Sequence, residues 1–360
     1  QRKKIIKIIK KPKKIKINRR KKLEFDDVLN SYLSLISKGD EVPVYLPDET
    51  FEKFFYRSIL EKNKNDCASP FFLSLGKRQM IVRGPEIDEA LKKYGKYLET
   101  PTPIDVKRGT TYYGGYAEDF IENDGFEILL KKYIECSKRN KILAVPFEIN
   151  SLDPKEGSKH ENMLIFNHKR KTIERYEPHG AYTNYPGFNS FYIDEVIDNG
   201  IVSYFRDNGV EMTYDRADET CPRNKIDFEP FGFQEKENLQ EIKDNMENRM
   251  YKGILIEEDG YCLAWSMWML DLRLKFPDKE PSELFTDAAN FLGVAKEGNL
   301  RKFIRGFARY YVDKLDELFK GYKKTIIKIL NDKTSDNIHY QDFMDLDNRI
   351  SKFFRQKYKM

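Results

Sequence analysis

The fold is decided by residues 259–272, which read DGYCLAWSMWMLDL. Gly260 breaks the preceding chain, and Cys262 opens an apolar run that is too dense for a surface helix. Pro277 stops that run. The pattern predicts a buried helix with a cysteine at its start.

A thiol at the start of a helix ionises more readily than a free thiol, because the backbone N–H groups there are unpaired and the helix dipole is positive. The thiolate is the nucleophilic form of cysteine. The structural alternative for Cys262 is an inert, small hydrophobic residue, since free cysteines are among the most buried residue types. A catalytic interpretation requires a base beside the thiol.

His160 is the candidate base, because it stands at the mouth of a hairpin that the sequence predicts. Residues 163–166 form an apolar strand, residues 167–170 a polar turn, and residues 171–177 the returning strand. Folding the hairpin about the middle of this turn places position 164 opposite 173 and position 160 opposite 177.

Directly opposed residues on paired strands have Cβ atoms about 5 Å apart. We therefore predict a contact between His160 and Glu177. Glu174 is the alternative acid, although it should lie deeper in the sheet. A register slip of one residue would send one partner to the other face.

A base beside a thiol, with a third group that orients the base, is the arrangement of an activated nucleophile. A zinc site is the competing use of these residue types, but its ligands would be His160, His168, Cys221 and Cys262, whose spacing matches no common zinc pattern. We expect neither a metal nor an organic cofactor.

Several motifs around these residues resemble the SUMO-protease and adenovirus-protease group of cysteine peptidases. They are VPFEIN at 145–150, His160, the hairpin end YEP at 176–178 and DGYC at 259–262. In that group the order is His, then an acid, then Cys. The motif ERYEPHG at 174–180 and the pair Cys221-Pro222 are most similar to papain-like peptidase proteins of large DNA viruses.

The resemblance, which covers about residues 140–276, implies that Cys262 attacks the scissile carbonyl, His160 takes and returns the proton, and Glu177 orients the imidazole. Family members carry a Gln a few residues before the Cys that helps to form the oxyanion hole, whereas Ile256 and Glu257 stand there in this chain. Its nearest replacements are Gln234 and Gln240, of which we assign Gln234.

The implied substrates are proteins cut after small residues, either ubiquitin-like conjugates or a viral structural polyprotein. Two other functions remain open. A Yop-type acetyltransferase has the same His, Glu, Cys order and transfers an acyl group to Ser, Thr or Lys, for which it requires acetyl-coenzyme A. A non-catalytic virion or nucleic-acid-binding protein on a decayed protease fold would account for the displaced Gln.

The basic character of the chain is concentrated at its start. Residues 1–22 hold thirteen Lys or Arg and no acid, so removing them from the net charge of +5 leaves −8 for the rest. Such a segment is typical of a disordered tail that binds polyanions, and nucleic acid is the expected partner, with a solubilising tail as the alternative.

The four cysteines have no CxxC spacing, and we expect no signal peptide. These features favour a reducing intracellular compartment, which is the host cytoplasm or nucleus, or the virion. No apolar run approaches the roughly 20 residues that span a bilayer.

The expected fold class is α+β, with a mixed central sheet and helical segments on both flanks. Four regions are expected: a basic disordered tail at 1–22, a helical N-terminal extension at 23–130, a cysteine-peptidase core at 131–280 and a C-terminal helical region at 281–360. Within them, periodicity and turn residues predict helices in 25–60 around a break at 42–47, helices at 88–98, 119–139 and 191–200, a loop at 107–117, strands at 141–149 and 210–214, and helices after 281.

Overall fold

The computed structural model describes most of the chain outside several connecting segments. The described residues are 17–34, 49–69, 72–76, 79–83, 112–116, 125–150, 159–181, 190–237, 261–293 and 299–321, with the short pieces 348–350, 352–353 and 356–357.

The described part of the chain contains both helices and strands. The helices are α1 (Ile17–Leu33), α2 (Glu49–Lys62), α5 (Gly125–Lys138), α6 (Ser190–Ile197), the π-helix η2 (Asp198–Val202), α7 (Ser203–Asp207), α8 (Ala217–Thr220), α10 (Cys262–Lys275), α11 (Pro281–Leu292) and α12 (Asn299–Leu318). The strands are β1 (Phe72–Gly76), β2 (Gln79–Arg83), β3 (Tyr112–Tyr116), β4 (Leu143–Asn150), β5 (Lys159–Asn167), β6 (Thr172–Tyr176) and β7 (Thr213–Asp215).

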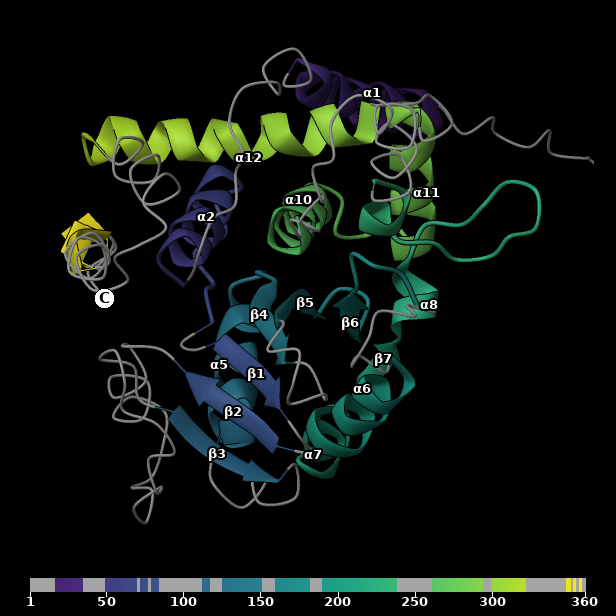
Figure 1. The fold of residues 1–360 in the computed structure, drawn as a ribbon. Coiled ribbons are helices and arrows are strands. Elements are labelled where there is room, and N and C mark those ends of the chain that lie inside the picture. Colours follow the sequence, from purple (N-terminus) through teal and green to yellow (C-terminus); the bar gives the residue numbers. More distant parts are fainter. Residues whose placement is uncertain are drawn as a thin grey trace, which may run out of the picture.

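The described strands form one seven-stranded sheet in the order β3-β2-β1-β4-β5-β6-β7 (Figure 1). Two neighbouring pairs, β1 with β4 and β6 with β7, are parallel, and the other four pairs are antiparallel. The sheet is therefore mixed, and the predicted α+β class with a mixed sheet is confirmed.

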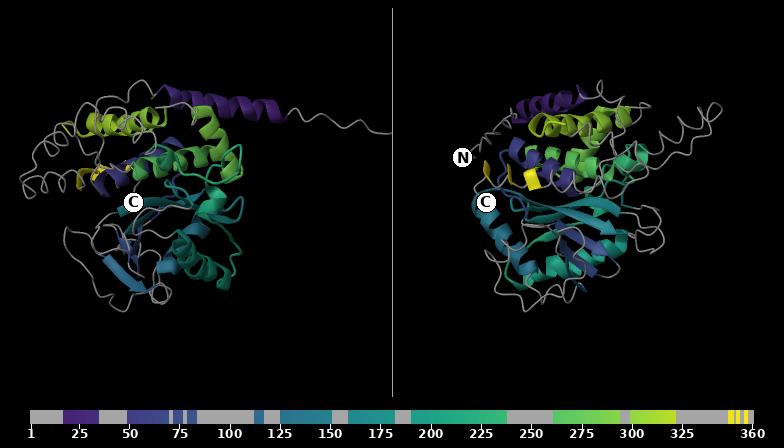
Figure 2. Two further views of the ribbon diagram at one scale, coloured as in Figure 1. Left: turned by 45° about the vertical axis from the view of Figure 1, so that its right-hand side comes forward. Right: turned by 60° about the vertical axis from the view of Figure 1, so that its left-hand side comes forward.

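Helices cover both faces of the sheet (Figure 2). Strand β4 shows why, because its residues alternate between two apolar clusters. Leu143, Val145 and Phe147 belong to a cluster with α5, α6 and α7, whereas Ala144 belongs to a cluster with α2, α10, α11 and α12. Successive side chains of a strand point to opposite faces, so a strand with apolar residues on both faces requires a layer on each side.

Helix α10 is the centre of the larger cluster and lies between β5 on one side and α2 and α12 on the other (Figure 1). Its apolar residues are buried all round, which is typical of a core helix rather than a surface helix. The Trp265 ring stacks on Phe233 at 5.1 Å between centroids, and Trp268 meets Phe303 of α12 edge to face at 5.3 Å. The predicted buried helix is confirmed, and it begins at Cys262.

Several predicted boundaries coincide with the structure because a proline marks them. Helix α2 begins at Glu49, two residues after Pro47, and α11 begins at Pro281 itself. Pro is favoured in the first turn of a helix, where a backbone N–H has no partner to lose. Helix α11 ends at Gly293, whose left-handed φ of 71° suits glycine.

On the N-terminal side the structure shows elements that the sequence did not predict. Helix α1 begins at Ile17 and so includes residues 17–22 of the basic segment. The region 23–130 also supplies β1, β2 and β3, the last of which occupies residues 112–116 within the loop predicted at 107–117. Strand β1 pairs with β4, whose residues follow about 70 positions later, and such a distant partner leaves no local sequence signal.

Other predictions fall outside the described residues. These are the segment 1–16 of the basic tail, the helix at 88–98 and most of the segment after 321. The four region boundaries and nucleic-acid binding by the tail stay predictions.

Cys67 and Cys136 form a disulfide, with their Cα atoms 5.7 Å apart. The two residues are 69 positions apart, so the local sequence gives no sign of this pairing. Cys221 and Cys262 are free thiols and buried. In the part of the chain that the structure describes, no helix combines the length and the apolar character that a membrane span needs.

Helix α12 should contribute strongly to stability, because Phe303 is fully buried among the aromatic side chains of α10. Phe303→Ala is expected to lower the free energy of unfolding by about 3–5 kcal/mol. Leu318→Ala on the same helix, where the side chain is half exposed, should change it by about 0.5 kcal/mol. Urea denaturation measures both, and equal effects would show that α12 does not belong to the core.

Candidate active site

His160 and Glu177 are in contact, as predicted, although the hairpin register differs from the prediction. Position 164 pairs with 175 rather than with 173, so the register is shifted by two residues. Because the side-chain period of a strand is also two, each residue keeps its predicted face. Glu177 therefore lies diagonal to His160 rather than directly opposite, and the contact survives.

The structure brings Cys262, His160 and Glu177 together. His160 Nε2 is hydrogen-bonded to Glu177 Oε1, and the Cys262 side chain is near enough to the same imidazole to raise its pKa. Both His160 and Glu177 are almost fully buried, and Cys262 is 9% exposed at the first residue of α10.

Burial and charge act in opposite directions on this pair. Burial opposes the charged form of His160, but Glu177 and Cys262 outweigh it and raise the pKa of the imidazole from 6.5 to about 10. Burial likewise opposes ionisation of Glu177, but His160 and then Arg175 lower the pKa of the carboxyl to about 2. At neutral pH the two groups form a buried imidazolium–carboxylate pair.

Both oxygens of the Glu177 carboxylate are held by further donors. Oε1 also accepts the backbone N–H of His179 at 2.9 Å, and Oε2 accepts Nη1 of Arg175 at 3.1 Å. Arg175 is fully buried, and its charge is balanced by Asp194 of α6 through hydrogen bonds of 2.8 and 3.2 Å. Asn162 Oδ1 accepts from the same Nη1 at 3.0 Å. The carboxylate is therefore fixed in orientation by the fold.

Glu174, the alternative acid, belongs to a different network. Its carboxylate accepts Nε and Nη2 of Arg273 on α10 at 2.8 and 2.5 Å, the Tyr176 hydroxyl at 2.6 Å and the Thr172 hydroxyl at 2.8 Å. Arg170 lies 3.6 Å from Glu174.

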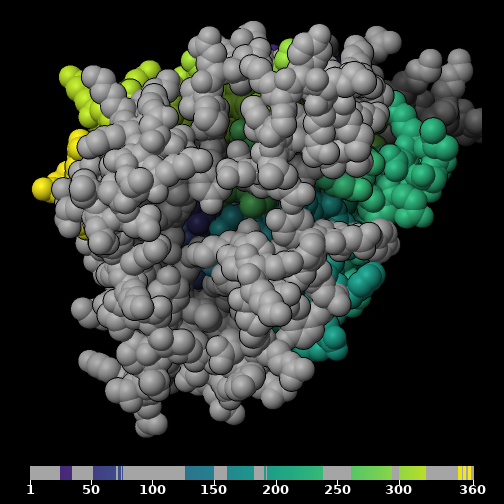
Figure 3. Space-filling model, in the orientation of Figure 1, coloured from purple at the N-terminus to yellow at the C-terminus, as the bar shows by residue number. Residues whose placement is uncertain are grey.

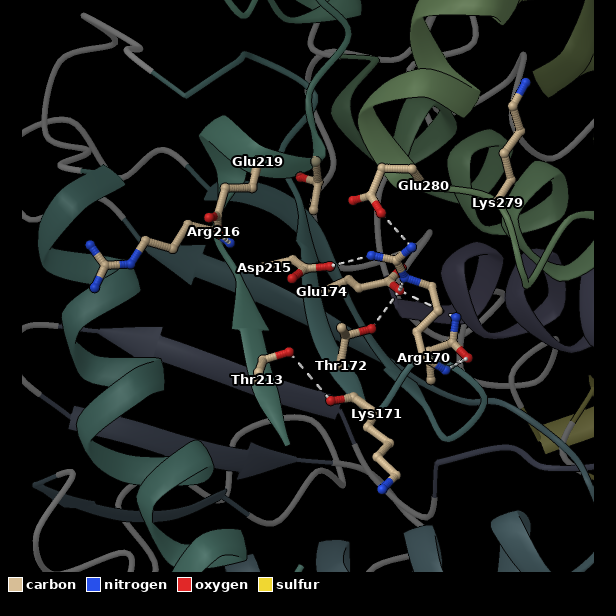
Figure 4. A network of polar contacts seen from close by, with 12 residues as sticks. Arg170, Lys171, Thr172, Glu174, Thr213, Asp215, Arg216, Glu219, Lys279 and Glu280 are labelled. Carbon is tan, nitrogen blue, oxygen red and sulfur yellow. Dashed lines mark hydrogen bonds and ion pairs between the residues drawn. The ribbon is translucent and has the colours of Figure 1, made fainter. Parts of the chain in front are cut away.

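Arg170 extends this network to two further carboxylates (Figure 4). It donates to Asp215 at 3.3 Å and to Glu280 at 2.5 Å. The network ties β6 to α10, β7 and the start of α11. Glu177, rather than Glu174, is the acid that contacts His160.

Gln234 lies beside the Glu177 segment. Its backbone N–H donates to the Pro178 carbonyl at 2.9 Å, and it follows Phe233, which stacks on Trp265. Its side chain is buried, and the carboxamide oxygen has no hydrogen-bond partner within the described part of the chain. Gln240, Ile256 and Glu257 fall outside that part.

Gly232 allows the close approach of the Gln234 segment to the segment after Glu177. A Cβ atom on Gly232 would stand 2.1 Å from the His179 carbonyl carbon and 2.4 Å from the Gly180 nitrogen. Any other residue would push the two segments apart, so glycine is required here for backbone contact.

The structure does not bring the four zinc candidates together. His160 and His168 are separated along β5 and the turn that follows it, roughly 26 Å in an extended strand. The His168 ring is hydrogen-bonded to Asn140 Oδ1 at 2.9 Å, away from the site. Cys221 lies nearer, since its thiol donates to the Glu177 carbonyl at 3.7 Å, but burial raises the pKa of that thiol and keeps it protonated.

His179 and Arg175 are members of the site that the sequence analysis missed. The His179 and His160 rings are 4.6 Å apart between centroids, and burial together with the His160 charge lowers the pKa of His179 to about 3. His179 is therefore neutral. Both residues lie within two positions of Glu177. The sequence offered one signal for Arg175, namely a charged residue inside a strand whose residues are all buried.

No family model matches the sequence. The chain is 25% identical over 334 residues to a putative ankyrin repeat protein of Acanthamoeba polyphaga mimivirus, a match that covers 89% of this chain and 40% of that protein. The chain thus spans about two-fifths of the length of this relative. This viral relative is named for ankyrin repeats and not for a peptidase.

Two solved structures are distantly similar. The SUMO protease Ulp1, with its catalytic cysteine oxidised to a sulfinic acid, has a TM-score of 0.27 and 11% identity, covering 80% of this chain and 95% of its own. The Legionella pneumophila effector protein RavZ has a TM-score of 0.31 and 9% identity, covering 87% and 82%. TM-scores of this size do not establish a common fold, so the interpretation of the site rests on its own residues.

The raised pKa of His160 makes stability depend on pH in a defined direction. The pKa of His160 rises from 6.5 to about 10 on folding. Its protonated form therefore stabilises the folded state fully below pH 6.5, and this contribution is lost as the pH approaches 10. The difference in Tm between the parent protein and His160→Gln should therefore shrink by roughly 5 °C or more between pH 6 and pH 10.

His168→Gln is the matched control for this titration. Burial lowers the pKa of His168, so its neutral form is favoured and its contribution is constant above pH 7. Differential scanning fluorimetry in a pH series measures both variants. A constant difference for His160→Gln would contradict the ion pair.

Proposed function

We propose that this chain is a cysteine peptidase in which Cys262 is the nucleophile, His160 the general base and acid, and Glu177 the group that orients the imidazole. The observation that carries the proposal is the buried contact of all three side chains at the start of α10. An inert core cysteine has no need of a charged histidine beside it, and a buried charge is costly unless it is paired.

The helix start and the imidazolium act on the thiol in the same direction. Each presents positive charge to Cys262, so each stabilises negative charge on the attacking sulfur. The thiolate would attack the scissile carbonyl carbon, and the proton held by His160 would pass to the leaving amine as the C–N bond breaks. Water would then hydrolyse the acyl-enzyme, with His160 accepting the proton of that water.

Gln234 is proposed to stabilise the negative charge that develops on the carbonyl oxygen. The oxygen of its buried carboxamide has no hydrogen-bond partner in the described part of the chain. Such a carboxamide can rotate to present its NH₂ group to a ligand. The backbone N–H of Cys262, at the start of a helix, is a second donor.

The substrate class is carried over from the resemblance to SUMO and adenovirus proteases. We propose that the scissile bond follows a small residue in a ubiquitin-like conjugate or a viral structural polyprotein. The viral relative supports the second of these substrates. Release of a fluorophore from a Gly-Gly peptide without acetyl-coenzyme A would distinguish the peptidase from an acetyltransferase.

The thiol and its base can be tested by alkylation with iodoacetamide from pH 5 to pH 9, read by mass spectrometry. Cys262 should react readily at pH 6, because a base stands beside its thiol. His160→Ala should reduce its rate at pH 6 by roughly tenfold or more, because the imidazolium is lost. Glu177→Gln should act in the same direction, since His160 would then be charged less often.

Two controls accompany this measurement. Cys221 in the same molecule should stay unreactive, because burial raises the pKa of its thiol. His168→Ala should leave the rate unchanged, since that ring lies at the far end of β5. If Cys262 does not react, or reacts as fast in His160→Ala as in the parent protein, the proposed nucleophile is wrong.

Gln234→Ala should separate stabilisation of the oxyanion from activation of the thiol. Loss of one oxyanion donor typically lowers kcat by about 10²–10³-fold. Turnover of the peptide should fall by this factor, while the alkylation rate of Cys262 stays at the parent value. Gln240→Ala, the other glutamine that the sequence offers, should have neither effect, and the opposite result would transfer the role to Gln240.

A further inference from the structure

The segment 221–231 is a well-defined hairpin that projects from the body of the protein, at the right of Figure 1 and of the space-filling view in Figure 3. Hydrogen bonds of 2.9 Å join Phe231 N to the Pro222 carbonyl and Asn224 N to the Glu229 carbonyl. Arg223 fixes the hairpin to the body, because its backbone N–H donates to Thr286 of α11 at 2.9 Å.

The tip of this hairpin exposes two large apolar side chains. Among the described residues four large hydrophobic side chains are exposed, and two of them, Ile226 at 94% and Phe228 at 70%, stand two positions apart here. Neither side chain stabilises the fold by burial. An exposed apolar pair on an ordered element is typical of a contact surface for another molecule.

Phe228 is also held in a backbone conformation that does not suit it. Its φ is +60°, a left-handed value that is unfavourable for a bulky aromatic residue. The conformation is fixed by hydrogen bonds of the Phe228 N–H to the Asn224 carbonyl at 3.2 Å and of Arg223 Nη1 to the Phe228 carbonyl at 3.1 Å. Asn or Gly would fit this position better, so folding does not account for Phe228.

Both ends of the hairpin are attached to the candidate active site. At one end the Cys221 thiol donates to the Glu177 carbonyl, and at the other Gly232 packs against His179 and Gly180. The tip is five residues from either end, so it extends at most about 17 Å. A folded domain of about 100 residues has a radius of gyration of about 13 Å, and one attached to a peptide in the active site would reach this far.

We propose that the hairpin 221–231 is a docking element for the folded part of the protein substrate, which it contacts through Ile226 and Phe228. This inference rests on the proposed peptidase function. The surface on the substrate is apolar, because the charges that flank the tip, Lys225 and Asp227, are of opposite sign and give it no net charge. The hairpin thus favours a folded protein over a short peptide with the same cleavage sequence.

Two fluorogenic probes distinguish docking from chemistry. One is a tetrapeptide that ends in Gly-Gly-aminomethylcoumarin, and the other is a ubiquitin-like protein with the same fluorophore on its C-terminus. Phe228→Asn and Ile226→Asn should each lower kcat/KM for the protein probe by about tenfold, mainly through KM, as expected when an apolar contact of about 1.4 kcal/mol is lost. For the tetrapeptide, kcat/KM should stay within about twofold of the parent value.

Stability provides an independent readout. Because Asn tolerates a left-handed φ, Phe228→Asn should keep the parent Tm or raise it by roughly 1–3 °C while cleavage of the protein probe falls. Leu318→Asn, an equally polar change at an exposed position on α12, should leave both probes unaffected.

The outcomes separate the two proposals. If the parent enzyme cleaves the tetrapeptide but shows no preference for the protein probe, or if the tip variants cleave both probes like the parent, the docking element is overturned and the peptidase stands. An equal loss on both probes in the tip variants also overturns it, because the tip would then act on the chemistry. If the parent enzyme cleaves neither probe, the proposed peptidase function fails, and with it the inference.

Discussion

The candidate site depends on the burial of one carboxylate. Glu177 is removed from water, and an isolated ionised carboxylate would cost several kcal/mol in that environment. The fold offsets this cost with donors on both oxygens, His160 and the His179 N–H on one and Arg175 on the other. Arg175 is itself balanced by Asp194 of α6, so positive and negative groups alternate from the core to the imidazole. Removal of any member leaves its neighbour with an unpaired buried charge.

A second buried pair positions the helix that begins with Cys262. Arg273, near the end of α10, is bound by Glu174 of β6 on the same hairpin that carries Glu177. Aromatic packing of Trp265 and Trp268 holds the middle of α10 against Phe233 and α12. The start of the helix has no side-chain cap, so its position relative to His160 follows from contacts further along the helix. Glu174 and Glu177, three positions apart, thus have different tasks, because Glu174 lies within β6 and Glu177 directly follows its last residue.

Much of the site could be predicted because its determinants are local. The glycine before Cys262 and the apolar run after it located the helix start, and the polar turn between two apolar segments located the hairpin. The register was wrong by two residues, but strand periodicity is also two, and the contact of His160 with Glu177 was preserved. Strands β1, β2 and β3 were not foreseen, because β1 joins the sheet through a partner distant in sequence.

The sequence by itself determined which chemical groups are available and which helices and strands carry them: a cysteine at a helix start, a histidine on a strand and an acid on the strand that returns. Local periodicity and turn residues suffice for such assignments. Only the tertiary structure decided which acid meets the imidazole, and that Arg175, Asp194 and His179 complete its surroundings. Those choices depend on strand register, on the close approach that Gly232 allows and on the pairing of buried charges between distant segments. None of these leaves a pattern in neighbouring residues.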